Sequence, residues 1–293
     1  MRRWVRLQEH LIRKSFDAEH VLKGPVPLID FANRDDAADA ARVDAGPKKG
    51  GWRISDDEVI GGFSRANLTV IRNRQEEDRV NKGLEPVPGS DSTNVDEDDN
   101  EAHENDNNND DDEDEEEDEE FLPFVRWKGT LDTRIGETSQ AKRSGFCAIR
   151  SPEFVMGGAR LGNRYNALEF LCRPDGRKYT VNLQVETSFP EDLYQNFITY
   201  DGPGGQSKNI VRAPQDPNGF TRVILPFRQF LLTSRGRLRE NQRVLDGGIA
   251  IERIGLTLMD EQDGDFVFDL AKIRAINYVD GLILGEEDDE APY

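Results

Sequence analysis

The sequence predicts an all-β protein, a β-sandwich of jelly-roll type, and three observations support that prediction. Between residues 123 and 279, apolar and polar residues alternate in successive short segments, as they do in strands with one buried face. Gly-containing turns such as Asp175-Gly176 and Asp263-Gly264 separate those segments. The long helices that parallel crossovers require are missing. We therefore expect antiparallel strands in two packed sheets.

The earliest strands precede the alternating region. Residues 26–31 read as a strand closed by a polar, alanine-rich stretch, and residues 52–71 hold further strands around Gly61-Gly62. Neither this part nor the part after residue 121 looks self-sufficient, so we expect both to belong to one domain.

The clearest alternation runs from residue 178 to residue 186, where the apolar phase consists of Tyr179, Val181, Leu183 and Val185. The Asp-Gly turn before it predicts a hairpin with residues 165–173. In that partner strand the side chains expected to face inward are Leu168, Phe170 and Cys172. The alternation recurs at residues 223–227, 254–258 and 266–270.

Charge and composition divide the chain into four parts. We expect a basic amphipathic segment at residues 1–24 and a single β-sandwich domain at 25–283. A long disordered acidic insertion at 73–120 interrupts the domain, and an acidic tail covers 284–293. The insertion has few apolar and no aromatic residues up to residue 120, so it cannot bury enough surface to fold. Residues 96–120 contain 18 acidic residues and no Lys or Arg. This run could bind a basic partner or simply be solvated.

The net charge of −20 comes almost entirely from that run, because the remaining chain holds 38 basic and 40 acidic residues. It contains no dense basic stripe, so we do not expect nucleic acid as a partner. No apolar run is long enough for a transmembrane helix, and no apolar signal-peptide core is present. We expect a soluble, intracellular protein.

The first sixteen residues are basic and amphipathic. Trp4, Leu7 and Leu11 recur at helical spacing among five Arg and Lys residues and one acid. Such a segment is typical of mitochondrial targeting, and the alternative is a short surface helix that docks on the domain.

The residue types of the predicted domain argue against an enzyme. The three histidines lie outside the strands, at positions 10, 20 and 103. The domain therefore lacks the commonest general base and metal ligand, and Cys147 and Cys172 are expected to be buried and inert. We predict no catalytic residue, no cofactor and no metal. Two alternatives are weaker: glycosidase carboxylates drawn from Glu169, Glu186 and Asp269, and a calcium loop at Asp260, Asp263 and Asp265.

Seven segments, in order, resemble the complex I intermediate-associated protein 30 family. The first is residues 55–64, SDDEVIGGFS, which resembles the family's aspartate, paired-glycine and serine signature. The others are residues 127–131 (WKGTL), 145–150 (GFCAIR), 173–179 (RPDGRKY), 194–197 (YQNF), 225–230 (LPFRQF) and 254–266. The likeness covers nearly the whole part of the chain that is expected to be ordered.

The resemblance implies a galactose-binding-like sandwich that acts as a non-catalytic assembly factor, or chaperone, for mitochondrial respiratory complex I. It implies that the protein holds membrane-arm assembly intermediates, together with other assembly factors, and leaves before the enzyme is finished. The implied location is the matrix side of the inner membrane, where the protein would be peripheral, and the alternative is cytoplasmic. The acidic insertion departs from an average member.

The family motifs also suggest positions for a binding rim. These are Asp56, Gly61, Gly62, Ser64, Tyr194, Gln195, Phe197 and Asp260. For the aspartate and glycines, the alternative is turn geometry, since Asp accepts backbone hydrogen bonds and Gly adopts positive φ. For the aromatic residues, the alternative is core filling. Two other functions stay open: a carbohydrate-binding module and a small-molecule enzyme of unknown reaction.

Overall fold

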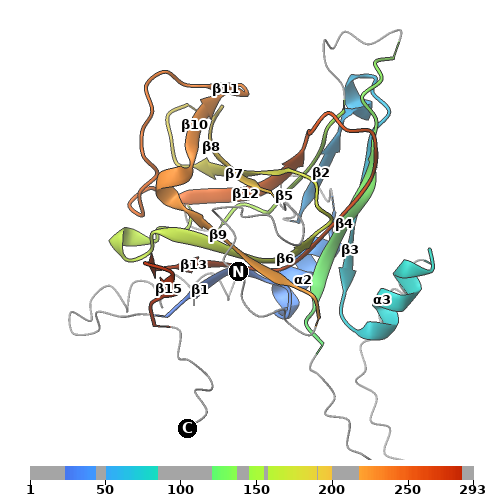
Figure 1. Cartoon of the computed structure of the whole chain (residues 1–293), viewed down its shortest axis with the longest axis horizontal. Helices are drawn as coiled ribbons and strands as arrows, with labels where there is room; N and C mark the ends of the chain where they lie inside the picture. The colour runs from blue at the N-terminus through green and yellow to red at the C-terminus, as the bar shows by residue number, and fades with distance from the viewer. Residues whose placement is uncertain are drawn as a thin grey trace, which may run out of the picture.

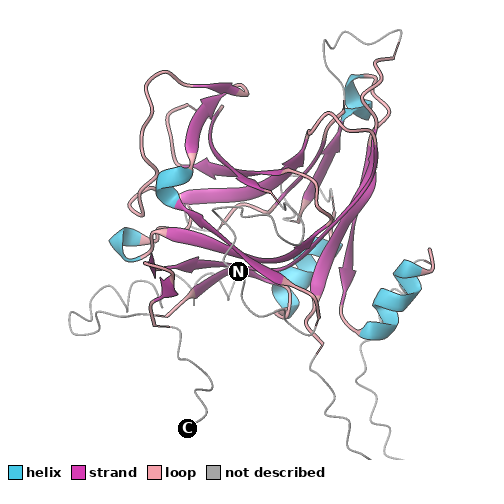
Figure 2. Cartoon of the chain, in the orientation of Figure 1, coloured by secondary structure: helices cyan, strands magenta, loops and turns pink. Residues whose placement is uncertain are grey.

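The computed structural model describes residues 24–43, 51–84, 121–136, 145–154, 158–189, 191–199 and 218–285. Two antiparallel sheets pack face to face in this part of the chain (Figures 1 and 2). The six-stranded sheet contains β1 (Val26–Asp30), β3 (Arg65–Ile71), β4 (Phe124–Leu131), β6 (Ala167–Pro174), β9 (Thr221–Pro226) and β13 (Gly264–Ile276). The seven-stranded sheet contains β2 (Arg53–Asp56), β5 (Cys147–Arg150), β7 (Tyr179–Val185), β8 (Asp192–Ile198), β10 (Leu231–Ser234), β11 (Arg237–Leu238) and β12 (Ile251–Leu258).

The strand order confirms the jelly-roll prediction. The central strands of one sheet run β4-β13-β6-β9, and those of the other run β5-β12-β7-β8. Most connections between consecutive strands therefore cross from one sheet to the other, and the first and last of these eight strands, β4 and β13, lie side by side. This is the interleaved order of two Greek keys. A small hairpin, β14 (Tyr278–Val279) with β15 (Leu282–Ile283), follows the last long strand.

The hydrophobic core lies between the two sheets. The apolar phase of β7 is buried along its whole length, as predicted, while the alternate residues are half-buried. Trp127 of β4 reaches across the core: its ring centroid lies 5.0 Å from that of Phe266 in its own sheet and 5.8 Å from that of Tyr179 in the opposite sheet. These fully buried rings contribute large apolar area, and they join the sheets into one core.

The predicted hairpin between residues 165–173 and 178–186 is wrong. β6 pairs with β13 and β9, whereas β7 pairs with β12 and β8. The turn does form, with Gly176 at φ 96°, but it carries the chain from one sheet to the other. The physical reason is that Phe170 and Val181 belong to faces that meet across the core. Strands that are neighbours in one sheet cannot face each other in this way.

In the described ranges, two α-helices, α2 (Arg34–Ala41) and α3 (Arg74–Asn81), lie outside the core sheets (Figure 2). α3 corrects the prediction that residues 73–120 are disordered throughout. Asn73 caps the helix by accepting a hydrogen bond from the Glu76 amide at 2.9 Å. Val80 packs in a small apolar cluster with Phe124, and Arg126 of β4 bonds to the helix. These tertiary contacts thus stabilise α3, whose own polar sequence provides little apolar packing.

The other predicted boundaries fall largely outside the described residues. These are the segment before residue 24, the part of the acidic insertion from 85 to 120, and the tail after residue 285. The described residues also contain three short 3₁₀ turns, η1 (Asp57–Ile60), η2 (Gly162–Arg164) and η3 (Phe227–Gln229). In the part of the chain that is described, no helix has the length and apolar character needed to span a membrane.

Candidate binding cleft and signature loop

The outer face of the seven-stranded sheet is hollowed. In Figure 1 the sheet curves, with β7 and β12 between two edges formed by β8 and β10 on one side and β2 on the other. A cleft of about 620 Å³ lies on this face, and side chains from β2, β5, β12, β7 and β8 line it. We call it the concave cleft. It faces away from the hydrophobic core, and most of its lining residues come from the outward-facing phase of each strand, while Ile54 and Ile149 of the inward phase also contribute to its base.

Strand register arranges these side chains in rows across the sheet. The central row joins directly opposed residues on five strands, and its members are Arg53, Arg150, Gly255, Asn182 and Gln195. On one side of it lies the row Arg253, Gln184 and Leu193, and on the other lies the row Ser55, Ala148 and Thr257. A ligand in the cleft would therefore lie across the strands rather than along one of them.

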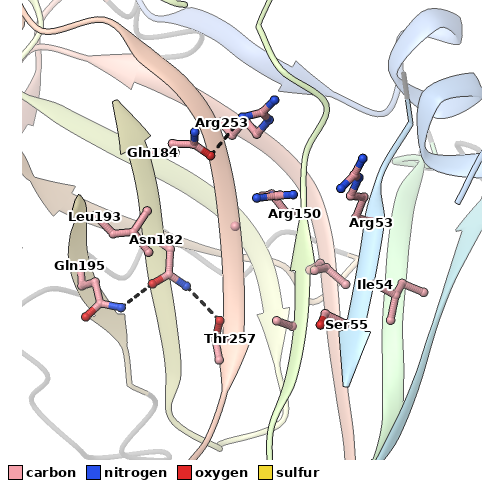
Figure 3. A pocket seen from close by; sticks show the side chains of 13 residues that line it. Arg53, Ile54, Ser55, Arg150, Asn182, Gln184, Leu193, Gln195, Arg253 and Thr257 are labelled. Atoms are coloured by element: carbon pink, nitrogen blue, oxygen red, sulfur yellow. Dashed lines mark hydrogen bonds between the residues drawn. The ribbon is translucent and has the colours of Figure 1, made fainter. Parts of the chain in front are cut away.

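The floor of the cleft carries a chain of side-chain hydrogen bonds (Figure 3). Gln195 Nε2 donates to Asn182 Oδ1 at 2.6 Å, and Asn182 Nδ2 donates to Thr257 Oγ1 at 2.9 Å. Arg253 Nη1 donates to Gln184 Oε1 at 3.1 Å. These contacts fix the orientation of the amides before any ligand arrives. An amide keeps further donors and acceptors for a ligand, because each can make several hydrogen bonds.

The concave cleft is lined by cationic and neutral polar side chains together with a few apolar ones. The described residues that line it include no His, Cys, Asp or Glu. General acid–base catalysis near neutral pH uses one of these groups in most enzymes. The cleft instead combines three guanidinium groups with neutral amides and hydroxyls, which can hold an anion and orient polar groups beside it.

The signature loop, residues 55–64, is built around Asp57 rather than around the Asp56 that was predicted for a binding rim. Asp57 is fully buried. Its Oδ1 accepts from the Ser64 amide at 2.8 Å, and its Oδ2 accepts from Ser64 Oγ at 3.1 Å and from the Gly145 amide. The carboxylate thus ties the loop after β2 to the residues just before β5. These are the two strands that form one wall of the concave cleft.

The paired glycines serve this arrangement. Gly61 adopts φ 84° at the end of η1, which is the left-handed region that glycine tolerates best. At Gly62, a Cβ would lie 2.2 Å from Cγ of Asp57, so any side chain there would displace the carboxylate. For Gly61 and Gly62, the structure therefore favours the turn alternative. Asp56 is half-exposed and accepts one hydrogen bond, from the Glu58 amide at 3.3 Å.

The predicted residues on β8 divide between the two faces of the sheet. Tyr194 is 2% exposed and belongs to the hydrophobic core. Gln195 lines the concave cleft. Phe197 lies on the same outer face, one row further along, and the Lys178 ammonium sits 4.1 Å from its ring centroid. The ring is therefore partly covered by a cation.

Asp260 lies away from the cleft and makes a bidentate ion pair. Arg177 donates to it from Nε at 2.9 Å and from Nη2 at 2.6 Å, and both side chains are largely buried. The Asp260 hydrogen bond is the largest cause that raises the pKa of Arg177. Arg177 also donates to the Gly264 carbonyl at 3.1 Å. This ion pair joins the connection between β6 and β7 to the connection between β12 and β13. Asp260 therefore has a structural role.

The carboxylates considered for glycosidase chemistry and for a calcium loop also make structural contacts. Asp269 and Glu169 are buried on the outer face of the six-stranded sheet, where Asp269 pairs with Arg126 and Glu169 with Arg274. Glu186 pairs with Arg160 at the surface. The groups proposed for a calcium loop bind protein donors as well: Asp260 binds Arg177, Asp263 accepts from the Thr133 amide, and Asp265 accepts from Thr130.

Both cysteines are free and buried, as the sequence suggested. Burial is the main cause that raises the pKa of the Cys147 thiol from 9.0 to about 12, and the negative charges of Asp56 and Asp57 add to it. Burial likewise raises the pKa of Cys172. A thiol that stays protonated at neutral pH is a poor nucleophile.

Sequence reasoning missed the cleft residues other than Gln195. Arg53, Arg150 and Arg253 are far apart in the chain, and only strand register brings them together. A usable signal existed in the polar phase of the strands. Arg53 and Arg150 alternate with the inward-facing Ile54 and Ile149.

Comparison with known proteins shows the family to which this chain is related. The profile of the complex I intermediate-associated protein 30 family matches residues 124–270, which is half of the chain and runs from the first residue of β4 into β13. The chain belongs to this family. A curated member from Mus musculus, "Complex I intermediate-associated protein 30, mitochondrial", is 30% identical over 152 residues. That match covers 48% of this chain and 41% of the mouse protein, so the chain spans about two fifths of that relative.

Solved structures with a similar arrangement include two of family 11 carbohydrate-binding modules of Clostridium thermocellum. One, in complex with a mixed-linked tetrasaccharide, has 11% sequence identity and a TM-score of 0.40, and the match covers 88% of this chain and 98% of the module. The other, from a cellulosomal cellulase, has 10% identity and a TM-score of 0.42, with 86% and 95% covered.

Proposed function

We propose that this member of the complex I intermediate-associated protein 30 family is a non-catalytic assembly factor for mitochondrial respiratory complex I. It binds assembly intermediates of the membrane arm, in company with other assembly factors, and leaves before the enzyme is complete. The observation that carries this proposal is family membership. The matched residues 124–270 span the jelly-roll core, so the likeness concerns the folded domain itself and not one short motif.

The chemistry of the domain supports a binding role. The concave cleft offers no proton-transfer group among its described lining residues. The buried carboxylates Asp57, Asp260 and Asp269 are held by hydrogen bonds or ion pairs that join strands and loops. Each of these carboxylates therefore stabilises the fold. In the proposed role, the protein acts through surface contacts with other molecules.

A mitochondrial location follows from the same proposal. The mouse relative is named as a mitochondrial protein. The basic amphipathic segment predicted at residues 1–24, which lies almost entirely outside the described residues, has the composition of a mitochondrial targeting segment. We place the protein on the matrix side of the inner membrane.

Deleting the gene and measuring complex I on native gels tests the proposal. We expect complex I to be lost, membrane-arm intermediates to accumulate, and the tagged protein to co-migrate with those intermediates. Restoring wild-type protein should recover complex I. An Asp56→Asn variant should recover it equally well, whereas Asp57→Asn should recover less, because only Asp57 is buried and ties the loop to β5. Normal complex I after deletion would refute the proposal.

A further inference from the structure

Three arginines meet at one end of the concave cleft. Arg53 on β2 is directly opposite Arg150 on β5. Arg253 on β12 lies two residues from Gly255, which is the partner of Arg150 on its other side. Figure 3 shows the three guanidinium groups side by side along this end of the cleft. Directly opposed residues have Cβ atoms about 5 Å apart, and like charges in that position destabilise a sheet.

The surrounding protein compensates this repulsion only in part. Glu153 pairs with Arg253, and Glu252 accepts from Gln184 at 3.1 Å, but neither carboxylate lines the cleft. Within the described ranges, no carboxylate forms an ion pair with Arg53 or Arg150. Partial burial, followed by the charges of Arg253 and Arg53, lowers the pKa of Arg150. An anion in the cleft would relieve this repulsion.

Next to the arginines, the lining of the cleft changes from positively charged to neutral polar side chains. Gly255 separates Arg150 from Asn182 in the central row, and its missing side chain leaves room between them. Beyond it come the amides and hydroxyl of the hydrogen-bonded chain: Asn182, Gln195 and Thr257. Groups of this kind both donate and accept hydrogen bonds, as the hydroxyls of a ligand do. The cleft therefore has a cationic end and a neutral polar end.

The size of the cleft indicates a small molecule. A volume of about 620 Å³ falls in the usual range for small-molecule sites, roughly 300–1,000 Å³. Stable protein interfaces cover about 800 Å² on each partner and centre on aromatic or Arg anchors set in well-packed pockets. No aromatic residue is among the described residues that line the cleft.

We propose that the concave cleft binds a small organic anion that carries hydroxyl groups beside a phosphate or carboxylate group. Arg53, Arg150 and Arg253 hold the anionic group. Asn182, Gln195 and Thr257 bind the hydroxyls across the floor. The site is separate from the complex I role, and it would stand as a ligand site even if the protein did not act on complex I.

Calorimetric titration of the purified full-length chain tests this site with defined probes. Glucose 6-phosphate and glucuronate carry both chemical features, whereas inorganic phosphate and glucose each carry one. We expect at least one of the first pair to bind more tightly than either of the second pair. Arg150→Gln should weaken that binding by about tenfold or more, since a charge-assisted contact is lost. Gln195→Ala should weaken binding of the sugar anion but leave binding of inorganic phosphate unchanged.

Arg228→Gln is the matched control. Arg228 is an exposed arginine in η3, outside the cleft, and its removal should change no affinity. Arg53→Gln provides a second cleft variant if Arg150→Gln changes the melting temperature. Absence of binding by both sugar anions at millimolar concentration would overturn the proposal. So would equal losses in Arg150→Gln and Arg228→Gln, or tighter binding of an Asp-rich peptide than of either sugar anion. None of these results depends on complex I levels in cells.

Discussion

Replacing Asp57 with Asn should destabilise the domain far more than the same change at Asp56. In the native loop, Asp57 Oδ2 accepts from Ser64 Oγ and from the Gly145 amide, and Oδ1 accepts from the Ser64 amide. An amide nitrogen in place of Oδ2 would face the Gly145 N–H, so a buried donor would lose its acceptor. An unsatisfied buried donor costs about 1–3 kcal/mol, and the other contacts lose their charge assistance as well. We expect a loss of about 3 kcal/mol in the free energy of unfolding.

Urea denaturation and thermal melting at neutral pH measure this loss. For a domain of this size, about 3 kcal/mol corresponds to a fall of roughly 6–12 °C in melting temperature. Asp56→Asn should change stability by less than about 0.5 kcal/mol, because Asp56 is half-exposed and Asn caps a helical turn equally well. If the two variants unfold at the same urea concentration, the structural role assigned to Asp57 is incorrect.

Three further predictions concern the folded domain. Asp269→Asn should cost about 3 kcal/mol because it removes the carboxylate that lies 2.8 Å from the buried Arg126 guanidinium and also pairs with Arg173, although Glu77 still pairs with both arginines. Replacing Asp269 and Arg126 together with apolar residues should restore part of the loss, and no restoration would contradict this. Arg177→Met should cost about 3 kcal/mol by leaving the buried Asp260 carboxylate unpaired, and a change within about 0.5 kcal/mol in urea melts would argue against it. Stability should fall as the pH rises from 9.0 towards about 12, because the Cys147 thiol ionises in the unfolded chain before it ionises in the folded one. Urea melts on either side of pH 9 measure this fall, and Cys147→Ala should make it shallower.

Local sequence patterns gave correct information about which residues are buried. The alternation in β7 and in β6 identified the inward faces, because a strand places successive side chains on opposite sides. The same patterns did not reveal strand partners. The turn at residues 174–178 has the residues of a hairpin, yet it connects two different sheets. Turn chemistry sets a local reversal, whereas the packing of two apolar faces decides which sheet receives the next strand.

In the candidate site, too, the sequence did not reveal which individual residues make tertiary contacts. The signature at residues 55–64 was recognisable, but the adjacent Asp56 and Asp57 could not be told apart without burial. The helix α3 was missed because its own sequence is polar, and its stability depends on contacts with the six-stranded sheet.

By itself, the sequence determined the fold class, the family and the scarcity of catalytic residue types, because these depend on composition, periodicity and the order of motifs along the chain. Only the tertiary structure decided that Arg53, Arg150 and Arg253 share one end of a cleft. Their juxtaposition depends on the register of strands that are distant in the chain. Register is set by how both apolar faces pack around one core, which no local segment specifies.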